Sequence, residues 1–212
     1  VLAGCAGSPS DSMSNNTSRA VWAPLARYVD AREAEFDAIP YDRQEVLKAL
    51  GEFVRTARDT GEAKLVFICT HNSRRSHFGQ VWAQVAAHHY GMDSLVTTYS
   101  GGTESTAFNE RAVGALRRAG FDIHPVLLSE NPKYAVHYAD DRDPMVCFSK
   151  KYDDAAHNPT SAFAAVMTCA DADKGCPIVY GAVARFSAPF IDPKASDGAP
   201  EEVATYDERC AQ

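Results

Sequence analysis

The sequence predicts an α/β fold in which a doubly wound parallel sheet follows an N-terminal helical extension. Apolar side chains recur at helical spacing over residues 18–60, and from residue 63 short apolar runs alternate with amphipathic segments. Strands separated by helices pair in parallel, and right-handed crossovers then place helices on both faces of the sheet. At 212 residues the chain has room for one such domain and an appendage.

We divide the chain into a tether at 1–17, a helical pair at 18–62 and an α/β domain at 63–212 with an insertion near 129–161. The pair is broken at Pro40 and closes at Gly61. The first helix carries Val21, Leu25, Tyr28 and Val29 at helical spacing. The second carries Val46, Leu47, Leu50, Phe53 and Val54 on one face.

The α/β domain is expected to contain five strands with helices between them. The strands are "KLVFIC" (64–69), "SLVTTYS" (94–100), "FDIHPVLL" (121–128), "FAAVMTC" (163–169) and "ARFSAPF" (184–190). The helices are 76–90, 108–119 and a last one from near Pro200. The insertion is irregular, although "YAVHY" (134–138) and "MVCFSK" (145–150) are expected to form a hairpin.

Composition excludes several classes of function. Hydrophobic residues make up 45% and charged residues 23%, which is typical of a globular protein, and no run approaches the roughly 18 apolar residues of a membrane span. The 21 basic and 28 acidic side chains give a formal net charge of −7, so a general affinity for nucleic acid has no support. Any anion site must therefore be local.

The first residues, "VLAGC", resemble the lipobox of bacterial lipoproteins, in which the cysteine carries a lipid. A small, polar stretch that reads as a flexible tether follows Cys5. The resemblance implies an envelope lipoprotein that faces the periplasm and touches the membrane only through its anchor. A chance match on a polar terminus, with a cytoplasmic location, is the alternative.

A lone cysteine ends the first strand of the α/β domain. Ligands of open α/β sheets bind beyond the carboxyl ends of the strands, where Cys69 lies. Residues 70–74 are expected to aim backbone N–H groups at an anion over the start of a helix, and such surroundings favour the nucleophilic thiolate. Arg75 presents a planar fork to two oxygens of a tetrahedral anion, and Ser76 hydrogen-bonds the sulfur. The alternative is a cysteine that merely packs in the core.

The stretch "CTHNSRRS", residues 69–76, resembles the signature of the low-molecular-weight protein tyrosine phosphatase superfamily. "YSGGTES", residues 99–105, is similar to a second motif of that superfamily. The likeness covers roughly residues 64–210 and implies a four-stranded parallel sheet, with Cys69 as nucleophile. The anion-binding loop would be Thr70, His71, Asn72, Ser73 and Arg74. Arg74 departs from the family pattern, and we expect it to sharpen the local positive charge or to face solvent.

Chemistry of this kind needs a proton donor for the departing oxygen. The pair Asp192-Pro193 follows a strand, and the superfamily carries its general acid in an Asp-Pro pair on a late loop. The aromatic residues that usually follow this pair are replaced by Lys194, Ala195 and Ser196. Asp192 is therefore the expected acid, and the departure counts against phosphotyrosine as the substrate.

The stretch "VMTCADADKGCP" resembles the redox segment of thioredoxin-coupled arsenate reductases. The resemblance implies that Cys69 attacks arsenate, Cys169 attacks the adduct and releases arsenite, and Cys176 takes over the disulfide for an external thioredoxin-like reductant. Residues 170–175 would supply the mobility. The alternative is a structural disulfide between Cys169 and Cys176, worth about 2.5 kcal/mol in the chain-entropy model. A protein outside the cytoplasm favours that alternative, so the relay and the lipobox conflict.

The two other cysteines of the α/β domain are not expected to take part in catalysis. Cys147 is expected to be structural, and Cys210 is given no role. No cofactor or resident metal is expected, although the resemblance extends to a potassium contact at Asn72 and Ser100.

Three functions remain open. The first is a thioredoxin-coupled arsenate reductase, and the second is a protein tyrosine (aryl phosphate) phosphatase that acts through a phosphocysteine on Cys69. The third is a non-catalytic anion-binding or redox-sensing lipoprotein. The substrate is expected to be arsenate or a phosphate ester.

Overall fold

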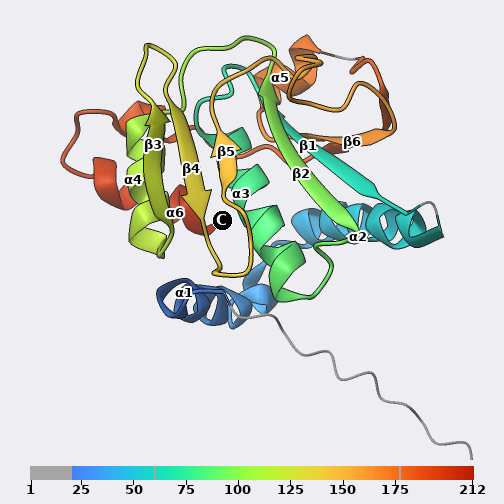
Figure 1. Ribbon diagram of the computed structural model, residues 1–212, viewed down its shortest axis with the longest axis horizontal. Coiled ribbons are helices and arrows are strands. Elements are labelled where there is room, and N and C mark those ends of the chain that lie inside the picture. Colours follow the sequence, from blue (N-terminus) through green and yellow to red (C-terminus); the bar gives the residue numbers. More distant parts are fainter. Residues whose placement is uncertain (1–20, 60, 177) are drawn as a thin grey trace, which may run out of the picture.

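The computed structural model describes residues 21–59, 61–176 and 178–212, so the predicted tether and its Cys5 lie outside it (Figure 1). The helices are α1 (Ala23–Glu33), α2 (Tyr41–Thr56), α3 (Arg75–His89), α4 (Glu110–Ala119), α5 (Ala170–Gly175) and α6 (Glu202–Ala211). The strands are β1 (Ala63–Cys69), β2 (Val96–Gly102), β3 (Asp122–Leu127), β4 (Lys133–His137), β5 (Met145–Cys147), β6 (Phe163–Met167) and β7 (Ala182–Ser187). None of these helices is both long and apolar enough to span a bilayer.

A four-stranded parallel sheet with the order β2-β1-β6-β7 forms the centre of the molecule. All five residues of β6 are buried, as in a strand covered on both faces. One face packs on α2 and α3, and the other packs on α5 and the segments around it. Cys69 pairs in register with Gly102, and Ile68 with Met167, so the carboxyl ends of three strands meet at one edge. The predicted α/β class and four-stranded sheet are confirmed.

A second sheet of three antiparallel strands, β3-β4-β5, lies beside the parallel one (Figure 1). The expected hairpin is confirmed, because β4 pairs antiparallel with β5. Residues 121–128 contain the expected strand, β3, but it lies outside the parallel sheet and pairs antiparallel with β4. Only a short loop separates β3 from β4, and a short loop allows antiparallel pairing alone. The insertion is thus built around the strand that precedes it.

The N-terminal helical extension is confirmed, and its two helices cover different parts of the core. Leu25 of α1 is fully buried in a cluster with α3 and α4, and Tyr28 stacks on Trp82 with 5.1 Å between ring centroids. Phe53 of α2 packs edge-on against Phe186 of β7 at 6.1 Å. Each helix therefore supports one of the elements that carry the site.

Candidate active site

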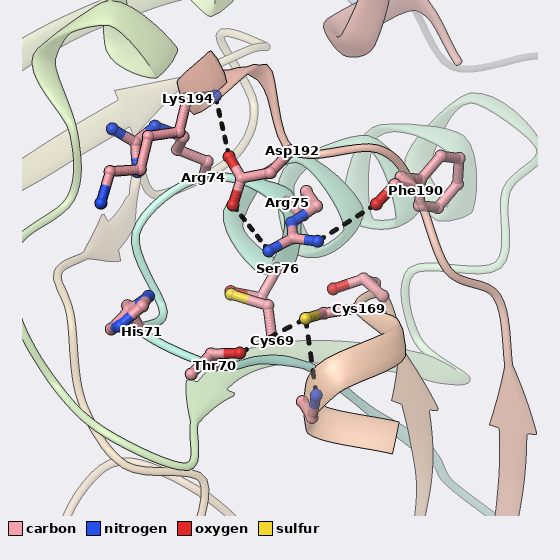
Figure 2. A network of polar contacts seen from close by, with 12 residues as sticks. Cys69, Thr70, His71, Arg74, Arg75, Ser76, Cys169, Phe190, Asp192 and Lys194 are labelled. Carbon is pink, nitrogen blue, oxygen red and sulfur yellow. Dashed lines mark hydrogen bonds and ion pairs between the residues drawn. The ribbon is translucent and has the colours of Figure 1, made fainter. Parts of the chain in front are cut away.

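The loop between β1 and α3 curves around the sulfur of Cys69 (Figure 2). The loop packs so closely on β2 that a Cβ atom added to Gly102 would lie 2.7 Å from the Thr70 carbonyl oxygen and 2.7 Å from the Asn72 nitrogen. Asn72 itself takes a left-handed conformation with φ of 44°, which asparagine tolerates better than most residues. A glycine on β2 and an asparagine in the loop thus set the path of the chain.

Two side chains hold the Cys69 sulfur in a defined polar environment. The Ser76 hydroxyl lies 3.1 Å from the sulfur, and the amide nitrogen of Asn72 donates to the same hydroxyl at 2.8 Å. Because the hydroxyl oxygen accepts from Asn72, its hydrogen is available to the sulfur. The Ser76 hydroxyl can therefore donate to the Cys69 sulfur.

A buried histidine that no sequence motif indicated, His77, links the loop to Ser100 of β2. His77 Nε2 lies 3.0 Å from the Asn72 carbonyl oxygen, and Nδ1 lies 3.3 Å from the Ser100 hydroxyl. A carbonyl only accepts, so Nε2 carries the proton and Nδ1 accepts from Ser100. Burial, with a contribution from the charge of Lys150, lowers the pKa of His77 well below its usual value. His77 is therefore a neutral brace of fixed orientation.

Backbone N–H groups and one guanidinium group give the loop the character of an anion site. Among the described residues, the N–H groups of residues 71–76 have no backbone acceptor. The Nε atom of Arg75 is buried and likewise has no hydrogen-bond partner in the described part of the chain. An unpaired buried donor such as Arg75 Nε is costly, and the backbone N–H groups are free of backbone acceptors, so this arrangement is suited to an oxyanion that would accept from them.

Asp192 reaches the same guanidinium group from the loop after β7. Arg75 donates to Asp192 Oδ2 at 2.7 Å and to the Phe190 carbonyl oxygen at 3.1 Å. The other oxygen of Asp192 accepts from the Lys194 backbone N–H at 3.0 Å and begins a 3₁₀ turn at Pro193. Figure 2 shows this carboxylate on the opposite side of the Arg75 guanidinium group from the Cys69 sulfur.

Cys169, at the end of β6, faces the same space as Cys69 (Figure 2). Its sulfur lies 3.3 Å from the hydroxyl of Thr70, the residue that follows Cys69. Burial raises the pKa of the Cys169 thiol, but hydrogen bonds from Thr70 and the Ala172 backbone, with the charge of Arg75, outweigh it and lower the pKa overall. Cys169 thus favours its thiolate while lying against the loop.

Cys176 lies at the other end of α5 and is partly exposed. Its thiol donates to the Ile178 carbonyl oxygen at 3.2 Å. The described cysteines are all free thiols, so Cys169 and Cys176 are not bridged in this structure. The segment between them was expected to be mobile, but it is folded as a helix whose N-cap is Cys169.

Of the two expectations for Arg74, the one that placed its side chain in solvent is wrong. The residue is 9% exposed, and its Nε donates to the Tyr206 hydroxyl at 2.6 Å. One of its terminal nitrogens donates to Asp197 at 3.0 Å, so its charge is balanced by that carboxylate. Arg74 thus ties the loop to α6 and the turn before it, a contact between residues more than 120 positions apart that the sequence did not reveal.

We expect the Arg74→Ala variant to lose about 2–3 kcal/mol of unfolding free energy, because Asp197 and the fully buried Tyr206 each lose a donor, although Tyr206 still donates to Asp197 at 2.7 Å. Urea denaturation measures this loss. The matched control is Arg118→Ala, which breaks an ion pair with Asp207 whose side chains are both 43% exposed and which should cost less than about 1 kcal/mol. Equal losses in the two variants would contradict the assigned role of Arg74.

The remaining loop residues are held by contacts with segments distant in sequence. The His71 side chain is 44% exposed, 3.6 Å from Glu104, and its carbonyl accepts from Ser149 at 2.9 Å. The Ser73 carbonyl accepts from the Asn109 backbone at 3.0 Å. The Asn72 side-chain oxygen accepts from the Lys150 backbone at 2.9 Å. The insertion therefore supplies two braces of the loop, Ser149 and Lys150, which no local pattern in the sequence indicates.

Cys147 and Cys210 lie away from the loop. Burial raises the pKa of each thiol to about 12, so neither is a nucleophile near neutral pH. Within the described residues, no group of three or more His, Cys, Asp or Glu side chains is arranged to hold a metal ion. The polar atoms named for potassium, on Asn72 and Ser100, have the protein partners given above.

Comparison with known proteins gives one family and several relatives. Residues 64–140 match the model described as low molecular weight phosphotyrosine protein phosphatase. An arsenate reductase of Bacillus licheniformis is 33% identical over 145 residues, which cover 68% of this chain and 84% of the relative. An arsenate reductase of Staphylococcus epidermidis is 27% identical over 129 residues, covering 61% of this chain and 77% of the relative.

Two solved structures resemble the chain at low sequence identity. A low molecular weight protein tyrosine phosphatase from T. tengcongensis has a TM-score of 0.46 at 15% identity, covering 70% of this chain and 90% of that chain. A thioredoxin-dependent arsenate reductase from Corynebacterium glutamicum has a TM-score of 0.40 at 16% identity, covering 79% of this chain and 65% of that chain.

Proposed function

This chain belongs to the low molecular weight phosphotyrosine protein phosphatase family, and from that premise we propose that it is an arsenate reductase with a relay of three thiols. The family comprises cysteine-dependent enzymes, and the curated relatives at 27% and 33% identity are arsenate reductases. The relay runs from Cys69 to Cys169 to Cys176. The observation that carries the proposal is the Cys169 sulfur, hydrogen-bonded to Thr70 beside the loop.

Arsenate would bind in the loop around Cys69. Its oxygens accept from the N–H groups of residues 71–76 and from the unpaired Nε of Arg75. The Cys69 thiolate forms an S–As bond while one As–O bond breaks. Asp192, held beside Arg75, takes up a proton from solvent before this step and gives it to the departing hydroxyl, which leaves as water.

The second step distinguishes a reductase from a phosphatase. The Cys169 thiolate attacks the Cys69 sulfur, so that an S–S bond forms and the S–As bond breaks. The bonding electron pair stays on arsenic, which is reduced from As(V) to As(III) and leaves as arsenite, while the two thiols are oxidised to a disulfide. The lowered pKa of Cys169 supports its role as the attacking thiolate.

The third step moves the disulfide toward the surface. The Cys176 thiolate attacks the Cys169 sulfur and releases Cys69 as a thiolate, without net oxidation or reduction. An external dithiol, such as that of a thioredoxin-like protein, then supplies the two electrons that reduce the Cys169–Cys176 bridge. Cys176 is partly exposed, which supports access of an external dithiol to the bridge.

Phosphatase activity is the second candidate. Cys69, Arg75 and Asp192 are the groups that phosphoryl transfer through a phosphocysteine requires. Their arrangement suits this reaction as well as it suits the first step of arsenate reduction. Cys169 and Cys176 have no part in that reaction. The residues after Asp192 offer no aromatic grip for a phosphotyrosine ring, because Lys194, Ala195 and Ser196 stand there. We therefore rank it below the reductase.

A comparison of turnover in cysteine variants tests the proposal. With a dithiol protein as electron donor, Cys169→Ser and Cys176→Ser should each abolish steady-state arsenite formation, while hydrolysis of an aryl phosphate stays within about threefold of the parent. Cys147→Ala, which removes a buried thiol outside the relay, is the control and should keep both activities. Arsenite turnover that persists in Cys169→Ser would contradict the relay through Cys169, and aryl phosphate hydrolysis with no arsenite formation in the parent would favour the phosphatase.

Envelope anchoring through Cys5 remains a prediction, since that residue lies outside the described part of the chain. Metabolic labelling with a fatty acid in a bacterial host tests it. Label that depends on Cys5 is the expected result, and an unlabelled chain would favour the cytoplasmic alternative.

We expect the Thr70→Val variant to slow the second step, because it removes a hydrogen bond to the Cys169 thiolate. The pKa of Cys169 should rise, so the profile of arsenite release moves to higher pH, with release about threefold to tenfold slower at neutral pH. Thr70→Ser keeps the hydroxyl and is the control. Stopped-flow measurement of the first turnover across a pH series reads the effect, and identical profiles for the two variants would refute it.

A further inference from the structure

The short helix α5 keeps the two outer thiols of the relay apart. Cys169 is its N-cap and Cys176 its C-cap, seven residues further on. At a rise of 1.5 Å per residue, an α-helix separates such positions by about 10 Å. A disulfide needs Cα atoms roughly 4.4–6.8 Å apart, so the Cys169–Cys176 bridge cannot form until α5 unwinds.

Two kinds of polar contact hold α5 in its helical form. The first is the relay thiol itself, because the Cys169 sulfur accepts from the Ala172 backbone N–H at 3.5 Å and so caps the helix (Figure 2). The second is a set of bonds from Asp173 to β7. Arg185 donates to the Asp173 carboxylate at 2.6 Å and to its carbonyl oxygen at 2.6 Å. Ser187 donates to the second carboxylate oxygen at 2.7 Å.

These bonds attach α5 to a fixed support. β7 pairs in parallel with β6 along its length, and Ser187 lies in register with Met167, two residues before Cys169. The Asp173 and Arg185 side chains are only 26% and 28% exposed, so solvent screens their charges incompletely. Burial raises the pKa of Asp173, but hydrogen bonds from Ser187 and Arg185 lower it overall, so the carboxylate stays charged at neutral pH.

We propose that Asp173, with Arg185 and Ser187 of β7, is a latch that holds α5 in the conformation in which Cys169 and Cys176 cannot bridge. The inference rests on the proposed function. Once Cys169 has bonded to Cys69, its sulfur is a weaker acceptor and the N-cap is lost. The latch is then the remaining polar restraint on α5, beside the packing of the buried Ala172, and its release sets the rate at which Cys176 takes over the disulfide.

The latch also explains how the resting protein avoids premature oxidation. Cys169 must remain a free thiol beside the loop until arsenate has reacted with Cys69. With a flexible segment, Cys176 could reach Cys169, and an external two-electron oxidant such as a small disulfide or diamide could then form the terminal bridge without any turnover. The helix, held by Asp173, imposes the order of the relay.

A single turnover without external reductant tests the proposal. Reduced protein is mixed with arsenate, free thiols are alkylated at timed intervals, and bridged peptides are quantified by mass spectrometry. In Asp173→Ala the Cys169–Cys176 bridge should form about fivefold faster than in the parent, and in Ser187→Ala by a smaller factor. The yield of arsenite should stay at one per protein, since its release precedes unwinding.

Asp171→Ala is the matched control, because it removes an exposed carboxylate from the same helix and introduces the same residue. The rate of bridge formation should stay within about twofold of the parent, as expected for loss of one exposed charge near the helix start. If Asp173→Ala forms the bridge no faster than Asp171→Ala, or more slowly than the parent, Asp173 is not a latch.

A second arm needs no arsenate and separates the latch from the proposed function. Diamide accepts two electrons and two protons from a pair of thiols and leaves them as a disulfide. In the resting protein, diamide should form the Cys169–Cys176 bridge about fivefold faster in Asp173→Ala than in Asp171→Ala. Absence of arsenite in the first arm with this difference intact would overturn the reductase and keep the latch, whereas equal diamide rates would overturn the latch.

Discussion

The Cys69→Ser variant is expected to lose both arsenate reduction and aryl phosphate hydrolysis, by about 10⁴-fold or more. Every covalent step proposed for either activity begins at this sulfur. A serine hydroxyl at the same position is not ionised near neutral pH and forms no relay disulfide with Cys169. Steady-state assays of both reactions on the same preparation measure the loss.

Oxyanion binding provides the control for that variant. The loop donors and Arg75 do not depend on the sulfur, so Cys69→Ser should still bind phosphate in a calorimetric titration with an affinity within about tenfold of the parent, the equivalent of one hydrogen bond. The fold, followed by circular dichroism, should be unchanged. Either activity retained above about 1% of the parent level would remove Cys69 from the nucleophile role.

The Arg75→Lys variant is expected to lower kcat/KM for arsenate and for an aryl phosphate by about 10²–10³-fold. Lysine keeps the positive charge but has no planar fork, so it cannot contact two anion oxygens while it also holds Asp192 and the Phe190 carbonyl. The general acid would then lose its position together with the anion. Steady-state kinetics on both substrates measure the effect.

The neighbouring arginine offers a matched control for Arg75→Lys. Arg74→Lys makes the same change one residue earlier, where the side chain is directed toward Asp197 and Tyr206. At a temperature at which both variants are folded, Arg74→Lys should keep kcat/KM within about tenfold of the parent. Equal losses in the two variants would contradict the assignment of anion binding to Arg75.

The parts of the fold that follow from local pattern could be predicted from the sequence. The apolar run that ends at Cys69, the helix after it and the helical extension before it have periodicities that few alternatives satisfy. Residues 121–128 have the same strand pattern whichever sheet they join, so periodicity could not place β3 beside β4. The polar segment 170–175 lacks an apolar face, and its helix depends on contacts to β7 that no local pattern reveals.

In the candidate site, the reactive residues could be predicted from the sequence and the residues that brace them could not. Cys69, Arg75 and Ser76 lie within one motif, and Asp192 and Cys169 follow strands whose carboxyl ends share an edge, so topology alone brings them together. The bracing residues could not be predicted, because each acts through a contact distant in sequence. Lys150 reaches Asn72 through a backbone N–H, which any residue carries, and Tyr206 reaches Arg74 from the last helix.

The relay itself is tested most directly by locating the disulfide after one exposure to arsenate. The reduced protein is treated with arsenate without an external dithiol, its free thiols are alkylated, and the bridged peptides are identified by mass spectrometry. We predict a Cys169–Cys176 bridge with one arsenite released per protein, and neither product in Cys69→Ser. All cysteines remaining reduced after exposure, or a Cys169–Cys176 bridge that forms equally in Cys69→Ser, would contradict the relay.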